Sequence, residues 1–287
     1  MANKQDAINI KKPSVGIIGC GWLGLALAKK CIEKSINVLV TTQSETSLTK
    51  VKANGLHGHM LSLPLAPDDT NHYAVFDQDV LIICIPPKLR HGQKNYAENI
   101  KSIVKLSKNN HVRKVVLIST TAVYQGYIGE VDEDTPLKLD IEKVAILSEA
   151  EQEVCSFSDN SVVLRCAGLV GPGRNPGNFF VKDKVVQSPN AYVNLVHQFD
   201  VVEQIFAFIT QQLPGGIYNC VSDMQVTKQH FYEVAAKSAG RPIPVFDQLS
   251  ELDLGKYVLA NKLRQTSPVQ HRYDDLIAWL STPQNDV

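Results

Sequence analysis

The chain has 287 residues, and its 29 basic and 29 acidic side chains balance, which argues against nucleic acid as the main ligand. Hydrophobic residues make up 44% and charged residues 20%, a composition that permits a large buried core and argues against disorder. The six cysteines lack C-x-x-C spacing, so we expect reduced thiols and no metal site. The first residues lack an apolar signal core and no apolar run could span a bilayer, so we expect a cytoplasmic protein without a membrane partner.

The first predicted unit, at residues 15–43, reads as strand, glycine turn, helix and strand. Its turn has the spacing G-x-G-x-x-G and consists of Gly19, Cys20, Gly21, Trp22, Leu23 and Gly24. Gly19 permits a tight exit from the strand, Gly21 lets a pyrophosphate approach the backbone, and Gly24 lets the helix lie close to the strand. The N-terminus of the following helix offers unpaired N–H groups to phosphates. The six turn residues are therefore predicted to bind a dinucleotide.

Strands and helices alternate along the next part of the chain. Further strands are expected at residues 56–63, 79–85, 114–119 and 162–166, and helices at residues 44–54, 96–106 and 141–157. Alternation of this kind predicts right-handed crossovers and a Rossmann-type α/β fold with a doubly wound parallel sheet. We assign residues 1–168 to this NAD(P)-binding domain, with some later segments returning to it.

The pattern loosens after a loop rich in glycine and proline at residues 168–177. Helices are expected at residues 179–186, 201–212, 229–239 and 273–280, and short strands at residues 193–196, 217–220 and 243–246. We assign residues 169–287 to a smaller C-terminal lobe that covers the cofactor and binds the substrate.

Ligands of a doubly wound sheet bind beyond the carboxyl ends of its strands. The cofactor site is therefore expected to include the residues Thr42, Gln43, Ser44, Ile85, Pro86, Pro87 and Ser119. NAD enzymes usually carry an acidic residue at the end of the second strand, where it accepts hydrogen bonds from the ribose. Residues 41–44 contain no acid, which removes a repulsion against a 2′-phosphate. The predicted cofactor is NAD(P), with NADP slightly favoured over NAD.

Five stretches together resemble the extended, or atypical, short-chain dehydrogenase/reductases, the group of the NAD-dependent epimerase/dehydratases. They are the glycine turn, ISTTAVY at residues 118–124, EDTP at 133–136, LRCAGLVGPGR at 164–174 and LVHQFDVV at 195–202. The order and spacing of the five stretches match those of the family, and together they cover most of the chain. The glycine spacing departs from the commoner G-x-x-G-x-x-G of the family, which indicates an atypical branch.

The resemblance implies hydride transfer between a nicotinamide and a substrate carbon. In the family a Ser or Thr at the strand end holds the substrate oxygen, and a Tyr in Y-x-x-x-K exchanges the proton. Thr120 falls on the Ser/Thr position, but no tyrosine occurs in residues 128–191. Aligning the helix on Glu151 puts Lys143 at the tyrosine position and Leu147 at the lysine position. Taking Lys143 as the lysine instead puts Leu139 at the tyrosine position, so neither register restores the pair. The remaining proton routes are Tyr124, Lys143 and a water molecule in the cleft.

The predicted substrate-binding residues are Arg174, Asn178 and His197. A guanidinium suits phosphate or carboxylate, although Arg174 could equally be a solvated loop charge. Thr120 and Tyr124 could instead only support the strand end, and His197 could be structural. The resemblance implies a small-molecule substrate, with a sugar nucleotide as one class, and a monomer or homodimer. The leading hypothesis is an oxidoreductase or epimerase-like enzyme with non-standard catalytic residues; the alternative is a catalytically impaired dinucleotide sensor.

Overall fold

A seven-stranded parallel sheet forms the centre of the protein. The computed structural model describes residues 12–65, 72–89, 92–180, 184–247 and 254–282. The strand order is β11-β7-β5-β4-β1-β2-β3, and every neighbouring pair is parallel. The strands are β1 (Val15–Ile18), β2 (Val38–Thr42), β3 (His57–Met60), β4 (Val80–Ile83), β5 (Lys114–Thr120), β7 (Val162–Cys166) and β11 (Gly216–Cys220). The predicted Rossmann-type fold is confirmed.

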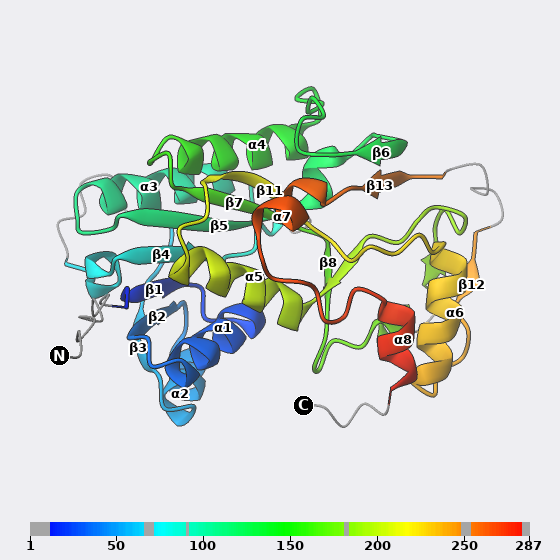
Figure 1. Ribbon diagram of the computed structural model, residues 1–287, viewed down its shortest axis with the longest axis horizontal. Coiled ribbons are helices and arrows are strands. Elements are labelled where there is room, and N and C mark those ends of the chain that lie inside the picture. Colours follow the sequence, from blue (N-terminus) through cyan, green and yellow to red (C-terminus); the bar gives the residue numbers. More distant parts are fainter. Residues whose placement is uncertain (1–11, 66–71, 90–91, 181–183, 248–253, 283–287) are drawn as a thin grey trace, which may run out of the picture.

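Helices cover both faces of this sheet (Figure 1). One face carries α3 (Tyr96–Lys108) and α4 (Glu142–Cys155), which contact each other. The other face carries α1 (Trp22–Glu33), α2 (Glu45–Ala53) and α5 (Gln198–Thr210). Because both faces are covered, β1 and β4 are buried along their whole length, which explains their almost wholly apolar sequences.

The C-terminal half contributes to two regions. Both α5, which packs on α1, and β11, which pairs with β7, belong to the central sheet and its helical layers. A second apolar cluster is built from residues such as Val170, Leu195, Phe231 and Leu276. It involves α6 (Lys228–Ser238) and α8 (Leu276–Ser281), which contact each other, and the paired strands β8 (Gly168–Val170) and β10 (Leu195–His197).

Short elements complete the fold. The strand β6 (Gly129–Val131) pairs with β13 (Lys256–Val258), and β9 (Val185–Val186) pairs with β12 (Val245–Phe246). The remaining helical segments are α7 (Asn261–Thr266) and the 3-10 turns η1 (Ala74–Asp77), η3 (Thr121–Tyr124) and η4 (Pro176–Asn178). Sequence periodicity did not predict β6, β13 or α7, because each is only a few residues long and depends on contacts distant in sequence.

The helix predicted at residues 179–186 is wrong. The described residues of this stretch follow the turn η4 and end in the strand β9, and residues 181–183 lie outside the described part. Phe179 and Phe180 pack against the second apolar cluster from an irregular segment. Their hydrophobicity therefore reflects burial and not a helical period.

The helix predicted from residue 273 begins three residues later. Asp275 is its N-cap, and its carboxylate accepts hydrogen bonds from the N–H groups of Ile277 and Ala278. An aspartate in this position fixes the first turn, so Tyr273 remains outside the helix.

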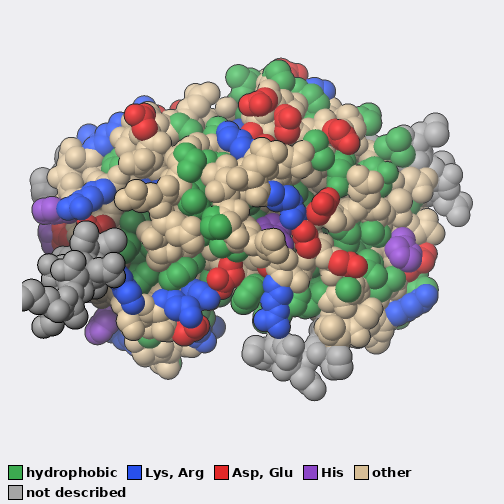
Figure 2. Space-filling view, viewed as in Figure 1, with side chains coloured by type: hydrophobic (Ala, Val, Ile, Leu, Met, Phe, Trp, Pro, Cys, Tyr) green, Lys and Arg blue, Asp and Glu red, His purple; other side chains and the backbone are tan. Residues whose placement is uncertain are grey.

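Charged side chains of both signs are interspersed over the face shown in Figure 2. Within the ranges that the structure describes, no helix combines the length and hydrophobicity that crossing a bilayer requires.

Gly24 controls how closely α1 approaches β1. A Cβ atom at this position would lie 2.4 Å from the carbonyl oxygen of Gly19, which is a backbone atom and cannot rotate away. At Gly21, in contrast, a Cβ atom would meet nothing within 4 Å. Replacing Gly24 with alanine is expected to lower the free energy of unfolding by about 1–3 kcal/mol through overpacking.

Urea denaturation of Gly24→Ala beside Gly21→Ala tests this expectation. The Gly21 variant should remain close to the parent protein, because its methyl group would enter open space. Equal unfolding midpoints for the two variants would contradict the close packing described here.

Candidate functional site

Two adjoining cavities follow the carboxyl edge of the central sheet. Their volumes are about 250 and 380 Å³, and both are lined by Gly21, Cys84, Ile85 and Pro86. Together they form one cleft beyond β1, β2, β4, β5 and β7. The strand order reverses between β1 and β4, and the crevice at such a point is where doubly wound folds bind their ligands.

The glycine turn forms the centre of this cleft. Gly19 has φ +97°, and a Cβ there would lie 3.0 Å from the backbone of Cys84, so the turn requires glycine. Gly21 is the N-cap of α1 and has open space beside its Cα. The first N–H groups of α1 therefore border open space, and such groups at a helix N-terminus are suited to bind anions. This geometry supports the roles predicted for the three glycines.

One half of the cleft lies over the ends of β1 and β2. It is lined by Gly19, Cys20, Gly21, Thr42, Gln43, Ser47, Leu63, Cys84, Ile85, Pro86, Lys88, Gln93 and Asn99. Ser44 lies beside it but its side chain caps α2 by accepting from the N–H of Ser47. Lys88 is the cation that sequence reasoning missed here, although it directly follows the Pro86-Pro87 pair at the predicted strand end.

The other half lies over the ends of β4, β5 and β7. It is lined by Gly21, Trp22, Leu23, Gly24, Cys84, Ile85, Pro86, Pro87, Tyr96, Ile118, Ser119, Thr120, Cys166, Ala167, Leu169 and Arg174. Thr120 therefore lies on the cleft at the position expected for it, and its hydroxyl accepts a hydrogen bond from the N–H of Ala122. The hydroxyl of Ser119 is directed to Glu151, to which it donates at 2.5 Å.

Trp22 and Arg174 connect the glycine turn to the loop after β8. The indole N–H of Trp22 donates to the carbonyl of Pro172 at 2.8 Å. The guanidinium of Arg174 lies 4.8 Å from the centre of the Trp22 ring, within range of a cation–π contact. This pair places a cation on the wall of the same half-cleft as Thr120.

Tyr124 lies in the protein interior and outside the residues that line the cleft. Its hydroxyl donates to Asn219 Oδ1 at 2.9 Å and accepts from Arg165 Nη1 at 2.7 Å. The other nitrogens of Arg165 donate to both carboxylate oxygens of Glu151 at 2.7 to 3.1 Å. Burial raises the pKa of the Tyr124 phenol, although Arg165 opposes this shift. The phenol is thus engaged in a structural network.

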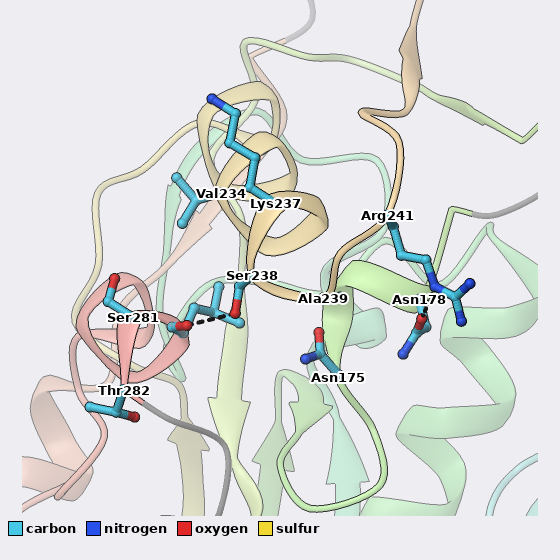
Figure 3. A pocket seen from close by; sticks show the side chains of 10 residues that line it. Asn175, Asn178, Val234, Lys237, Ser238, Ala239, Arg241, Ser281 and Thr282 are labelled. Atoms are coloured by element: carbon cyan, nitrogen blue, oxygen red, sulfur yellow. Dashed lines mark hydrogen bonds between the residues drawn. The ribbon is translucent and has the colours of Figure 1, made fainter.

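The other predicted substrate residues lie away from the cleft. Asn178 lines a separate cavity between α6, α8 and η4, where it accepts from Arg241 at 3.0 Å (Figure 3). His197 is buried against the rings of Tyr273 and Trp279. Burial, assisted by the charge of Arg272, lowers its pKa to about 4. The neutral imidazole accepts from the N–H of Phe199 and caps α5.

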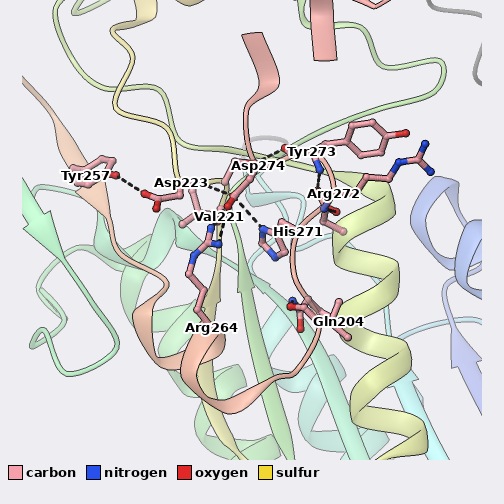
Figure 4. Close-up of polar contacts among 12 residues, drawn as sticks. Gln204, Val221, Asp223, Tyr257, Arg264, His271, Arg272, Tyr273 and Asp274 are labelled. Carbon is pink, nitrogen blue, oxygen red and sulfur yellow. Dashed lines mark hydrogen bonds and ion pairs between the residues drawn. The ribbon is translucent and has the colours of Figure 1, made fainter. Parts of the chain in front are cut away.

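The segment before α8 is fixed by two carboxylates, of which Asp200 is buried and Asp274 is partly exposed (Figure 4). Asp200 accepts the backbone N–H groups of Arg272 and Tyr273 at 2.7 and 3.1 Å. Asp274 accepts two hydrogen bonds from Arg264 and one from the N–H of Asp223. These contacts hold the C-terminal segment against β11 and α5. In the described part of the chain, no cluster of three or more His, Cys, Asp or Glu side chains is arranged to hold a metal.

Comparisons with known proteins agree with this architecture. Residues 14–123 match the family described as NADP oxidoreductase, coenzyme F420-dependent. Protein YeeZ of Escherichia coli K12 is 28% identical over 265 residues, which cover 91% of this chain and 96% of YeeZ.

Solved structures share the fold over nearly the whole chain. The Bordetella bronchiseptica enzyme WbmG, solved with NAD and UDP, has a TM-score of 0.74 at 14% identity, covering 93% of each chain. The UDP-glucuronic acid 4-epimerase of Bacillus cereus, solved with NAD, has a TM-score of 0.70 at 17% identity, covering 93% of this chain and 95% of the epimerase. The chain thus has the fold of the NAD-dependent epimerase/dehydratase-like proteins, and the resemblance seen in its motifs is confirmed at this level.

Replacing Tyr124 with phenylalanine tests the structural role of its hydroxyl. The variant leaves a buried donor of Arg165 and a buried acceptor of Asn219 without their partner. We expect the free energy of unfolding to fall by about 1–3 kcal/mol, while the affinity for a dinucleotide stays unchanged. Urea denaturation and calorimetry measure the two quantities.

Tyr127→Phe is the matched control, because Tyr127 is more exposed and donates only to the carbonyl of Pro136. It should change stability much less. Unchanged stability of Tyr124→Phe together with lost dinucleotide affinity would place the phenol in the cleft.

Proposed function

We propose that this protein is an NAD(P)-dependent oxidoreductase or epimerase-like enzyme that acts on a small molecule. The observation that carries the proposal is the pair of adjoining cavities that extend from the glycine turn, past Pro86, to Thr120. These cavities lie between the N-terminus of α1, where a phosphate would bind, and the Thr120 hydroxyl at the end of β5. Proteins of similar fold were solved in complex with NAD, which supports dinucleotide binding by this fold.

The residues of the cleft suit the two ends of a dinucleotide. The pyrophosphate would lie at Gly21 and the N-terminus of α1, with the adenosine over β2 and the nicotinamide over β5. A bound nicotinamide supplies hydride chemistry. The chain itself would hold the substrate oxygen at Thr120, with Trp22 and Arg174 on the wall of the same half of the cleft. Residues around the second apolar cluster would form the substrate lobe.

A sugar nucleotide is the substrate class that we favour. WbmG, of similar fold, was solved with UDP as well as NAD, and the Bacillus cereus protein acts on UDP-glucuronic acid. In the present protein, Arg174 lies on the wall of the nicotinamide half of the cleft, where a guanidinium suits phosphate or carboxylate oxygens.

A dinucleotide sensor is the second candidate function. It is favoured by the absence of a tyrosine from α4 and by the engagement of Tyr124 with Arg165 and Asn219. The two candidates differ in one measurement. Absorbance changes of bound nicotinamide after addition of UDP-glucose or UDP-glucuronic acid indicate an enzyme, whereas tight dinucleotide binding without such changes indicates a sensor.

Gly21→Asp is expected to abolish dinucleotide binding without unfolding the protein. Its backbone, at φ −86°, accepts any residue, and a side chain here meets nothing within 4 Å. The new carboxylate would oppose the pyrophosphate. Calorimetric titration with NAD⁺, NADH, NADP⁺ and NADPH measures the loss, and Gly21→Ala, which adds no charge, is the control. If the unaltered protein binds none of the four dinucleotides, the proposal is refuted.

Lys88 is expected to select NADP. Among the described residues lining the adenosine half, none is acidic, and Lys88 is the one that carries a full positive charge. A hydrogen bond from a charged group contributes about 1.5–3 kcal/mol. Lys88→Ala should therefore weaken NADP⁺ binding about tenfold or more and affect NAD⁺ far less.

Lys94→Ala provides the control, because Lys94 pairs with Glu142 and does not line this cavity. Parallel titrations of both variants with NAD⁺ and NADP⁺ give the comparison. Equal losses of the two affinities in Lys88→Ala would show that Lys88 does not read the 2′-phosphate.

A further inference from the structure

A lysine from the C-terminal part of the chain reaches the end of β5. Lys256 is the first residue of β13, and its ammonium nitrogen donates to the carbonyl oxygen of Thr121 at 2.6 Å. Thr121 directly follows Thr120, whose side chain lines the nicotinamide half of the cleft. The ammonium group is therefore fixed at the backbone carbonyl of the residue that follows Thr120, whose hydroxyl is expected to hold the substrate oxygen. Lys256 itself is not among the residues that line the two cavities.

The backbone of Lys256 is held on two sides, so this reach is built into the fold. On one side β13 pairs with β6, which follows the turn after Tyr124. On the other side the carbonyl of Lys256 accepts from Asn194 Nδ2 at 2.9 Å, and Asn194 Oδ1 accepts from the N–H of Val258. The strand thus has little freedom to carry the ammonium away.

Two further lysines contribute charge at this point. Lys143 comes from the first turn of α4, at the position that the family gives to its tyrosine, and Lys228 is the first residue of α6. Burial, reinforced by the charges of Lys143 and Lys228, lowers the pKa of Lys256 to about 8. An ordinary lysine titrates near about 10.4. The neutral amine is therefore accessible close to physiological pH.

We propose that Lys256 is the proton-transfer residue of this cleft and takes over the task of the tyrosine that α4 lacks. The inference rests on the proposed function. It is carried by the fixed position of the ammonium group on the carbonyl of Thr121, the residue after Thr120, and by the engagement of Tyr124 in the interior.

When a secondary alcohol is oxidised, its carbon gives a hydride to the oxidised nicotinamide and its hydroxyl gives a proton to the neutral amine of Lys256. The products are a ketone, the reduced nicotinamide and an ammonium group. In the reverse direction the ammonium returns the proton as the hydride reaches the carbonyl carbon. One N–H of Lys256 can stay on Thr121 in both states.

Lys114, on the strand β5 that ends at Thr120, provides a control. It lies at the opposite end of β5, donates to the carbonyl of Phe208 at 2.9 Å, and has a pKa lowered by burial. It thus shares the chemistry and partial burial of Lys256 but borders no residue of the cleft lining.

Competitive acetylation of the full chain with acetic anhydride over a range of pH, followed by peptide mass spectrometry, measures the titration of individual lysines. Lys256 should become reactive with a midpoint near 8, and Lys143→Met should raise that midpoint by removing a positive neighbour. Saturating NAD⁺ or NADP⁺ should slow the acetylation of Lys256 and leave that of Lys114 unchanged.

Variants separate proton transfer from a merely structural contact. Lys256→Arg keeps a donor for Thr121 but cannot release its proton near neutrality. It should retain stability and dinucleotide affinity while reducing turnover of UDP-glucose or UDP-glucuronic acid about 10²–10⁴-fold. Lys114→Met should leave turnover and its pH profile unchanged. In the unaltered protein, alcohol oxidation should increase with pH with a midpoint near 8, because the neutral amine is the base.

An ordinary lysine midpoint for Lys256, or acetylation that ignores the dinucleotide, overturns the inference while leaving cofactor binding intact. Full turnover by Lys256→Arg overturns it as well. Absence of dinucleotide binding, together with a midpoint near 8 for Lys256, refutes instead the proposed function on which the inference rests.

Discussion

One buried guanidinium holds together the sheet edge on which the cleft depends. Arg165, on β7, donates to Glu151 on α4 and to Tyr124 in the turn after β5, and Tyr124 continues the network to Asn219 on β11. Burying two charges is costly unless their hydrogen bonds are satisfied, and here both carboxylate oxygens have donors. The network fixes the ends of three neighbouring strands, and Thr120 is positioned by this edge.

Because of this network, the protein departs from the catalytic pattern that its motifs suggest. A tyrosine that donates to Asn219 and accepts from Arg165 is committed to structure, so the V-Y of the strand-end motif marks a packing site. The helix α4 carries Lys143 where a tyrosine would be expected. In the proposed reaction, charge at the substrate end would come from segments outside the central sheet, since Arg174 and Lys256 both lie in the C-terminal half.

Local patterns predicted what local forces determine. The glycine turn, the buried strands and the helices of the central sheet follow from short-range periodicity and from the absence of a Cβ at Gly19 and Gly24. Motif spacing could not place Asn178 or His197, because their positions depend on how the loop after β8 folds onto α6 and α8. The position of Lys88 directly after a predicted strand gave a weak indication that it lines the cleft. Nothing in the sequence indicated where Lys256 lies, since only the pairing of β13 with β6 brings it to the end of β5.

In the proposed reaction, the positive charges around Lys256 would also connect proton transfer to the state of the cofactor. An oxidised nicotinamide carries a positive charge, and in the cleft it would further lower the proton affinity of Lys256, which Lys143 and Lys228 already lower. The amine would then be neutral when an alcohol must lose its proton. A reduced cofactor lacks that charge, so the proton affinity of Lys256 would be higher once the ketone has formed. Hydride and proton transfer would therefore favour each other in both directions.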